Sequence, residues 1–310
     1  FESPFCVTSL LIICMYLASF SSILTYITLV LLITGICLFF IEMGHFFFFK
    51  KPSFQINSYL LPILLHAILV ISVTAQIFYN DTNLHYWDDF THWGLIPKLT
   101  FIFDGLPFNT HYSFYPDYLP GAGLFSYFFS IPHKMSGLIY SEKLSLVSQS
   151  VIIFSCFVLF FRNIFEKKIL FNLILFSLMI FLTFSYTEGL STLMIEHVLG
   201  FYFAACVYSI FFSNNKKFLY VTLIGAIALS TLKSSTQLLT FVVLTMATVN
   251  TLFMRFEKVN LTLSKSFFDR ATIKALFLIF LSTLLALIIK YMWKNYMDGA
   301  PLIYDTEIGF

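Results

Sequence analysis

The stretch 86–98 holds the greatest density of side chains that could do chemistry: it reads Tyr-Trp-Asp-Asp-Phe-Thr-His-Trp-Gly-Leu-Ile-Pro-Lys. Adjacent carboxylates such as Asp88 and Asp89 can take a proton from an attacking group or hold a divalent cation. In an α-helix, Asp88 and His92 would lie on one face because they are four residues apart. The structural alternative is that an aspartate caps the helix and that His92 is a solvated surface residue.

A second polar cluster, 111–121, reads His-Tyr-Ser-Phe-Tyr-Pro-Asp-Tyr-Leu-Pro-Gly. Its candidates for binding a substrate are His111, Tyr115 and Asp117. The alternative interpretation is a turn fixed by proline, with its tyrosines at a membrane interface.

Two further ionisable residues interrupt apolar sequence. Glu196 lies inside an apolar run next to His197, and Lys233 separates two apolar runs. An ionisable group at membrane depth is costly, which makes both residues candidates for substrate binding. Glu196 could instead be satisfied by a neighbouring helix, and Lys233 could extend from a helix end toward water.

The composition is that of a membrane protein. Of the 310 residues, 59% are hydrophobic and only 11% are charged, and the mean hydropathy is +0.86. Soluble proteins carry about 25% charged residues, so this chain could not cover a water-facing surface. The net charge of +2 gives no reason to expect nucleic acid as a partner, and the five cysteines form no CxxC pair that would indicate a zinc site.

The elements that must position these residues are transmembrane helices, and the expected fold is an all-α polytopic bundle of about nine spans. Residues 5–42 are long enough for two helices joined by a tight turn. The other expected spans are 57–79, 144–162, 169–187, 191–212, 218–233, 236–254 and 274–293. The apolar segment 118–131 is shorter and is expected to lie at the interface without crossing.

The loop 80–143 is expected to face outward and to carry amphipathic interfacial helices. Most of the 18 basic residues fall in the loops expected on the side opposite to 80–143. Lysine and arginine favour the cytoplasmic side, so those loops are expected to be cytoplasmic. Apolar residues recur at the helical spacing of a surface-lying helix, namely at Phe90, Trp93, Ile96, Leu99 and Phe103. In such a helix Trp87 and Trp93 would both lie at headgroup level.

Three regions are expected along the chain. Residues 1–56 form a transmembrane hairpin and a cytoplasmic loop, and residues 57–293 form the membrane core. Residues 294–310 begin an outward C-terminal segment, which we expect to be truncated.

These elements together resemble the GT-C superfamily of membrane glycosyltransferases, which includes protein mannosyltransferases and aminoarabinose transferases. In that group a large outward loop follows one helix and bears an acidic motif at its start, as 87–90 would follow 57–79. Related bacterial sequences read W-D-E-F-x-H-W, and 87–93 is similar, with Asp89 in place of glutamate. The stretch 115–121 is loosely similar to a Y-P-P-G element of the same group.

The resemblance extends to two later positions. Glu196 is similar to a second acidic residue near the outer end of a later helix, where many members have aspartate. The stretch 228–233 resembles an L-x-K element that ends in Lys233.

The resemblance implies transfer of a sugar from a polyprenyl-phosphate carrier to a lipid, glycan or protein acceptor. The reaction would take place at the outer face of a bacterial inner membrane. Asp88 or Asp89 would be the catalytic base, and a cation, Lys233 or His92, would offset charge on the leaving phosphate. Some members of the group use a divalent cation and others do not, so the metal requirement is left open.

Two other classes of function fit parts of the sequence. A transporter would place ionisable groups or broken helices near mid-membrane. A non-catalytic membrane scaffold would use the aromatic loop to bind a partner. An enzyme would instead gather Asp88, Asp89, Glu196 and Lys233 around one cavity.

Overall fold

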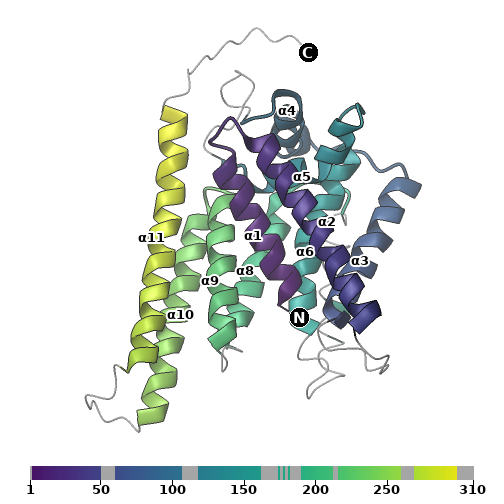
Figure 1. Ribbon diagram of the computed structural model, residues 1–310. Coiled ribbons are helices and arrows are strands. Elements are labelled where there is room, and N and C mark those ends of the chain that lie inside the picture. The colour runs from purple at the N-terminus through teal and green to yellow at the C-terminus, as the bar shows by residue number, and fades with distance from the viewer. Residues whose placement is uncertain are drawn as a thin grey trace.

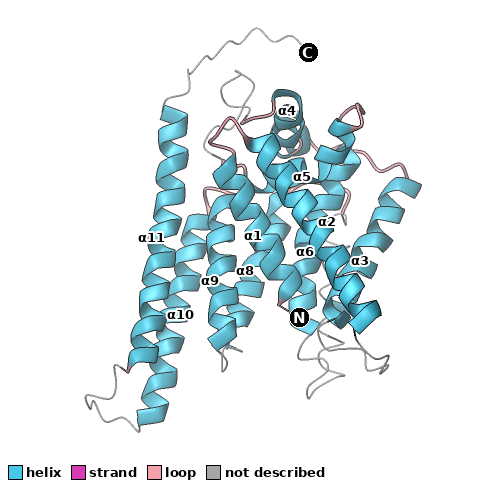
Figure 2. Ribbon diagram, in the orientation of Figure 1, coloured by secondary structure: helices cyan, strands magenta, loops and turns pink. Residues whose placement is uncertain are grey.

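The computed structural model describes residues 2–49, 60–106, 118–161, 190–211, 216–259 and 269–298, together with residues 174, 177, 178 and 181. Within these ranges every regular element is a helix, and most of the helices lie alongside one another in a bundle (Figures 1 and 2). The expected all-α class is confirmed.

Eight apolar helices make up the bundle among the described residues. Five are long and apolar enough to cross a membrane: α2 (Leu24–Phe49), α3 (Leu60–Tyr79), α6 (Glu142–Phe160), α10 (Thr236–Val259) and α11 (Arg270–Asp298). Three are shorter: α1 (Ser3–Ala18), α8 (Ile195–Phe211) and α9 (Lys216–Leu232). They occupy every expected span except 169–187, which lies almost wholly outside the described residues. Their lengths and composition are those of an integral membrane protein.

The expected tight turn joins α1 to α2. Pro4 lies in the first turn of α1, where its missing N–H costs nothing. At the other end, the Ser19 hydroxyl donates to the Tyr16 carbonyl oxygen and the Ser21 hydroxyl donates to that of Ala18, each at 2.7 Å. The serines thus satisfy carbonyl groups that the end of the helix leaves open.

Helix α6 lies at the centre of the bundle. Its residues from Ser145 to Leu159 are all buried, and it packs against α1, α3, α5 and α8. Three of its buried serines, Ser148, Ser150 and Ser155, donate to carbonyl oxygens of their own helix, as when Ser150 donates to the Leu146 carbonyl oxygen at 2.9 Å. A helix can bury such hydroxyls in apolar surroundings because its own backbone supplies the partner.

Between α3 and α6, three short helices lie at one end of the bundle, at the top of Figure 1. They are η1 (Asp89–Trp93), α4 (Leu95–Phe103) and α5 (Gly121–Met135). The segment 118–131 forms most of α5, whose 15 residues cover about 22 Å, less than the roughly 30 Å of a hydrocarbon core. Helix α5 packs against α1, α4, α6 and α9, and so caps the centre of the bundle.

The other chain segments at this end are the α1–α2 turn, residues 190–194 before α8, and residues 233–235 between α9 and α10 (Figure 1). The helix starts at Lys216 and Arg270 lie at the opposite end. The polar residues singled out in 88–92, at 196 and at 233 therefore belong to one end of the bundle.

Candidate functional site

The acidic motif opens a π-helix and not the expected α-helix. The Gly94 backbone N–H donates to the Asp89 carbonyl oxygen, five residues back, at 2.7 Å. A Cβ at Gly94 would lie 2.6 Å from that oxygen and 2.6 Å from Leu84 Cδ1, so the turn requires glycine. Single π-turns are rare and frequently occur at functional sites.

The wide turn changes which side chains share a face. Asp88 is exposed, whereas His92 is buried, so the expected shared face of these two residues is wrong. Trp87 and Trp93 also separate: their exposed fractions are 72% and 7%. Trp93 therefore belongs to the packed interior, and only Trp87 is available to lie at a surface.

Asp89 is fully buried and joins η1 to the segment before α8. Its Oδ1 accepts hydrogen bonds from the Leu193 backbone N–H at 2.8 Å and from the Thr192 hydroxyl at 3.1 Å. Its Oδ2 is buried and has no hydrogen-bond partner among the described residues. Burial raises the pKa of Asp89 above its ordinary value, although the bonds from Leu193 and Thr192 act to lower it.

Neither aspartate caps a helix. Asp88 occupies the N-cap position of η1, but its side chain makes no capping hydrogen bond. The side chain of Asp89 bonds outside its own helix, to residues 192 and 193. The capping alternative for this pair is therefore wrong, and the exposed carboxylate of Asp88 is the one that a molecule outside the fold can reach.

Lys233 and Glu196 form an ion pair at the same end of the bundle. Lys233 Nζ lies 2.5 Å from Glu196 Oε1, and the side chain of Glu196 is 64% exposed against 15% for Lys233. The same ammonium lies 5.4 Å from the ring centre of Trp93 and 5.0 Å from that of Tyr118. These two rings are stacked, with centroids 5.6 Å apart and an interplanar angle of 13°.

This arrangement fixes the lysine from three sides. Trp93 comes from η1, Glu196 from α8, and Tyr118 from the residues before α5. An ammonium over aromatic faces is attracted by their electron density, and the pairing carboxylate adds a direct charge contact. Three segments that are distant in sequence thus hold one cation at the end of α9.

His92 completes the aromatic cluster. Its ring makes edge contacts with Trp93 at 4.5 Å and with Tyr118 at 4.8 Å. Burial, aided by the nearby charge of Lys233, lowers the pKa of His92 to about 3. The imidazole is therefore neutral near pH 7, and Lys233 supplies the positive charge of this cluster.

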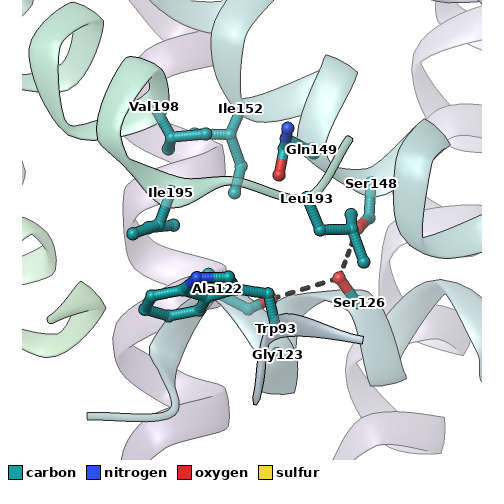
Figure 3. Close-up of a pocket in the computed structure, with 10 residues that line it drawn as sticks. All are labelled: Trp93, Ala122, Gly123, Ser126, Ser148, Gln149, Ile152, Leu193, Ile195 and Val198. Carbon is teal, nitrogen blue, oxygen red and sulfur yellow. Dashed lines mark hydrogen bonds between the residues drawn. The ribbon is translucent and has the colours of Figure 1, made fainter. Parts of the chain in front are cut away.

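A small cavity with a mostly apolar lining lies beside Trp93, between α5, α6 and α8 (Figure 3). Its volume is about 10 Å³, which is the space of one water molecule at most. Trp93 and Leu193 line it together with Ser126, Ser148 and Gln149. The Ser126 and Ser148 hydroxyls are 2.6 Å apart, as the dashed line in Figure 3 marks.

Gln149 of α6 also bonds to the segment before α8. Its amide nitrogen donates to the Thr192 carbonyl oxygen at 2.7 Å and lies 2.8 Å from His197 Nε2. Thr192 is thus bonded to both Asp89 and Gln149, and Leu193 to Asp89. This double attachment fixes the start of α8, and with it the position of Glu196.

The expected site is assembled only in part within the described residues. Asp89, His92, Glu196 and Lys233 are linked through the contacts above, whereas neither aspartate lines the cavity of Figure 3. His111, Tyr115 and Asp117 lie outside the described residues. Over the ranges that the structure describes, no three histidine, cysteine, aspartate or glutamate side chains lie close enough to hold a metal ion.

Sequence reasoning missed the residues that position the others. Tyr118, Gln149 and Thr192 are uncharged, and each lies in sequence typical of an apolar or interfacial segment. Gln149 and the three serines near it in α6 do form a polar stripe in a run expected to be a membrane span. Such a stripe could have indicated contacts with polar groups on neighbouring helices.

We compared the chain with protein-family models, curated proteins and solved structures. None of the three comparisons finds a match.

Proposed function

We propose that this protein is a membrane glycosyltransferase. It would move a sugar from a polyprenyl-phosphate carrier to a lipid, glycan or protein acceptor at the membrane face that holds η1. The observation that carries the proposal is the gathering of an exposed aspartate, a fixed lysine and its paired glutamate at one end of an apolar bundle.

The proposal assigns different roles to the two aspartates. Asp88 is the base: its exposed carboxylate takes the proton of the acceptor hydroxyl as that oxygen bonds to the anomeric carbon of the sugar. Asp89 is a positioning residue, since its carboxylate is buried against residues 192 and 193. The sequence alone did not divide these roles.

Lys233 is the phosphate-binding cation in this mechanism. The bond between the anomeric carbon and the phosphate oxygen breaks with its electron pair going to the phosphate. A fixed ammonium stabilises the charge that then develops on the leaving oxygen. Glu196 and the Trp93–Tyr118 stack hold the ammonium in place before the donor arrives.

The membrane arrangement that goes with this mechanism has about nine spans, with the η1 end outside the cytoplasm of a bacterial cell. The carrier is a membrane lipid, so its sugar is presented at the surface of the bilayer. A site at one end of the bundle suits that substrate better than a site near mid-membrane would. A transporter would require the reverse placement.

The test begins with deletion of the gene. A donor that is no longer consumed should accumulate, and mass spectrometry of extracted lipids would identify its sugar. The accumulated lipid-linked sugar then becomes the substrate for the purified full-length protein.

Asp88→Asn is the decisive variant, with Asp298→Asn as its matched control. Both replace an exposed aspartate, and Asp298 lies at the end of α11. We expect Asp88→Asn to transfer sugar roughly 10²–10⁴-fold more slowly with unchanged thermal stability, and Asp298→Asn to behave as wild type. Absence of any accumulated lipid-linked sugar, or normal transfer by Asp88→Asn, would sink the proposal.

A further inference from the structure

A second and larger pocket lies at the same end of the bundle as η1. Its volume is about 500 Å³, and its wall is the segment 138–143 together with Asn83, Lys98 and His133. Its lining includes none of the three residues of the proposed catalytic cluster, Asp88, Glu196 and Lys233. The pocket is therefore separate from that cluster.

Its depth in the membrane follows from the helices beside it. Asn83 comes four residues after the end of α3, and the segment 138–143 leads into the first turn of α6. Both helices are long and apolar enough to cross a membrane, and they pack against each other. The pocket therefore lies just beyond the ends of two neighbouring spans, which is the level of lipid headgroups.

The charges of the wall favour an anion. Lys98 is exposed and makes no ion pair among the described residues. Lys143 is paired with Asp81, and Glu142 Oε2 accepts a hydrogen bond of 3.4 Å from the Leu84 backbone N–H. The acidic groups near the pocket therefore already have donors, whereas the ammonium of Lys98 is available.

His133 belongs to the same wall, and its ring is held by the backbone. Its Nδ1 lies 3.4 Å from the Ile139 carbonyl oxygen, which can only accept, so this nitrogen carries a hydrogen. In this tautomer Nε2 holds a lone pair and accepts hydrogen bonds, so His133 gives the wall no donor toward a phosphate oxygen. Lys98 and Lys143, whose ammonium has three hydrogens and uses one on Asp81, provide the charged donors that bind phosphate oxygens.

The rim of the pocket is apolar. Ile139 is 87% exposed and Leu138 is 52% exposed, and Met135 one turn earlier is also exposed. A phosphate dissolved in water gains nothing from such a rim. A lipid does, because its glycerol and acyl groups can cover the apolar side chains while the phosphate meets the cations.

We propose that this pocket binds the phosphate headgroup of an anionic membrane lipid. Binding there does not depend on sugar transfer, because the pocket shares no residue with the catalytic cluster. The lipid would join the loop after α3, helix α4 and the start of α6, the three segments that supply Asn83, Lys98 and Glu142.

Native mass spectrometry of the purified full-length protein tests the proposal. Phosphatidylglycerol is the anionic probe, and phosphatidylcholine is the neutral one. We expect phosphatidylglycerol to bind more tightly than phosphatidylcholine, and Lys98→Gln to weaken its binding about fivefold, as loss of one surface lysine near a headgroup would. Lys294→Gln, which removes an exposed lysine of α11 at the same end, should bind as wild type.

Three outcomes would overturn the proposal. The first is equal binding of the two lipids, and the second is equal weakening by Lys98→Gln and Lys294→Gln. In the third, inorganic phosphate displaces phosphatidylglycerol while Leu138→Ser and Ile139→Ser leave its affinity unchanged, which would identify free phosphate as the ligand. Thermal unfolding of each variant confirms that it folds, which we expect for Lys98→Gln because this side chain is exposed and makes no ion pair among the described residues.

Discussion

The two aspartates at 88 and 89 are adjacent in sequence but differ in every physical property that matters for catalysis. Asp88 is exposed, whereas Asp89 is fully buried and bonded to Leu193 and Thr192. The sequence could identify the pair, because two carboxylates beside a histidine and two tryptophans stand out in an apolar chain. It could not divide their roles, because the burial of each depends on the π-turn and on a segment 104 residues away.

The buried state of Asp89 predicts a pH dependence of stability. Its pKa in the folded protein is raised above the ordinary value of 3.8, so the folded state binds this proton more tightly than the unfolded state does. Stability contributed by Asp89 is therefore lost as pH rises from 3.8 through the raised value. We expect the melting temperature of wild type, relative to that of Asp89→Asn, to increase as pH is lowered from neutral toward 4.

Thermal unfolding of both proteins at several pH values measures this difference, and the comparison cancels the contributions of other titrating groups. A difference that does not change with pH, or that grows as pH rises, would contradict it. Asp89→Ala should be more damaging than Asp89→Asn at every pH. It leaves the Leu193 N–H and the Thr192 hydroxyl without this acceptor, at a cost of about 1–3 kcal/mol.

Neutralising Glu196 and neutralising Lys233 should have different effects, the first a small one on stability and the second a large one on sugar transfer. Glu196→Gln should change the free energy of unfolding by less than about 1 kcal/mol, because this carboxylate is 64% exposed and water screens the pair. Lys233→Gln should lower the kcat/KM for the lipid-linked donor roughly tenfold to a hundredfold, since a charged contact to phosphate is lost. Lys233→Arg, which keeps the charge and can stack on the two rings, should recover part of that loss.

Steady-state kinetics on purified variants would measure these effects. Equal activity of wild type and Lys233→Gln would remove the lysine from the site, and a full loss in Lys233→Arg would show that charge alone is not sufficient.

Among the helices, those with a plain apolar run could be predicted and those with a mixed pattern could not. The expected spans match α2, α3, α6, α10 and α11 because length and hydropathy alone define them. The expected amphipathic helix is divided into η1 and α4, and Phe90 and Phe103 at its two ends are exposed while Ile96 is buried. A spacing rule that assumes 3.6 residues per turn fails at η1, where the backbone hydrogen bond spans five residues and not four.

The packing of α9 against α1 and α8 gives a prediction about one glycine. A Cβ at Gly225 would lie 2.7 Å from a ring carbon of Phe5 and 2.8 Å from Cys206 Sγ, whereas a Cβ at Gly200 meets nothing within 4 Å. Gly225→Ala should therefore destabilise the protein by about 1–3 kcal/mol through overpacking. Gly200→Ala should be neutral or should stabilise it by up to about 1 kcal/mol, because alanine favours a helix interior.

Thermal unfolding in detergent compares the two variants directly. Both replace a helical glycine with alanine in the same protein, so a general effect of the exchange would appear in both. Equal melting temperatures would mean that the three helices are not as closely packed at Gly225 as described.

For the whole molecule, the arrangement of the helices places the polar segments at two opposite ends. The loop after α3, the residues before α8 and those after α9 lie at one end, and the starts of α9 and α11 lie at the other (Figure 1). The alternation of loops along the sequence predicts this grouping, because each span reverses the side. The close contacts within one end do not follow from it, since they require the helices to be placed side by side.

The sidedness of the membrane can be tested with single cysteines in a background from which the five native cysteines have been removed. Asn83→Cys and Arg270→Cys place the thiol at opposite ends, and both native residues are exposed. We expect a membrane-impermeant maleimide to label Asn83→Cys in intact cells and to label Arg270→Cys only after permeabilisation. Labelling in the reverse order would place the η1 end in the cytoplasm.

The contact between α1 and α8 has a consequence for biosynthesis. The Tyr202 hydroxyl bonds to Ser9 across 193 residues of sequence, and Phe5 packs on the same tyrosine ring. At 5–20 residues per second, a ribosome needs roughly 10 to 40 s to make the chain between them. During that time α1 exists without α8. The Ser9 hydroxyl still has a hydrogen-bond partner then, because it also donates to the Phe5 carbonyl oxygen of its own helix. This contact is therefore completed long after α1 is made, while α9, α10 and α11 still follow in the chain.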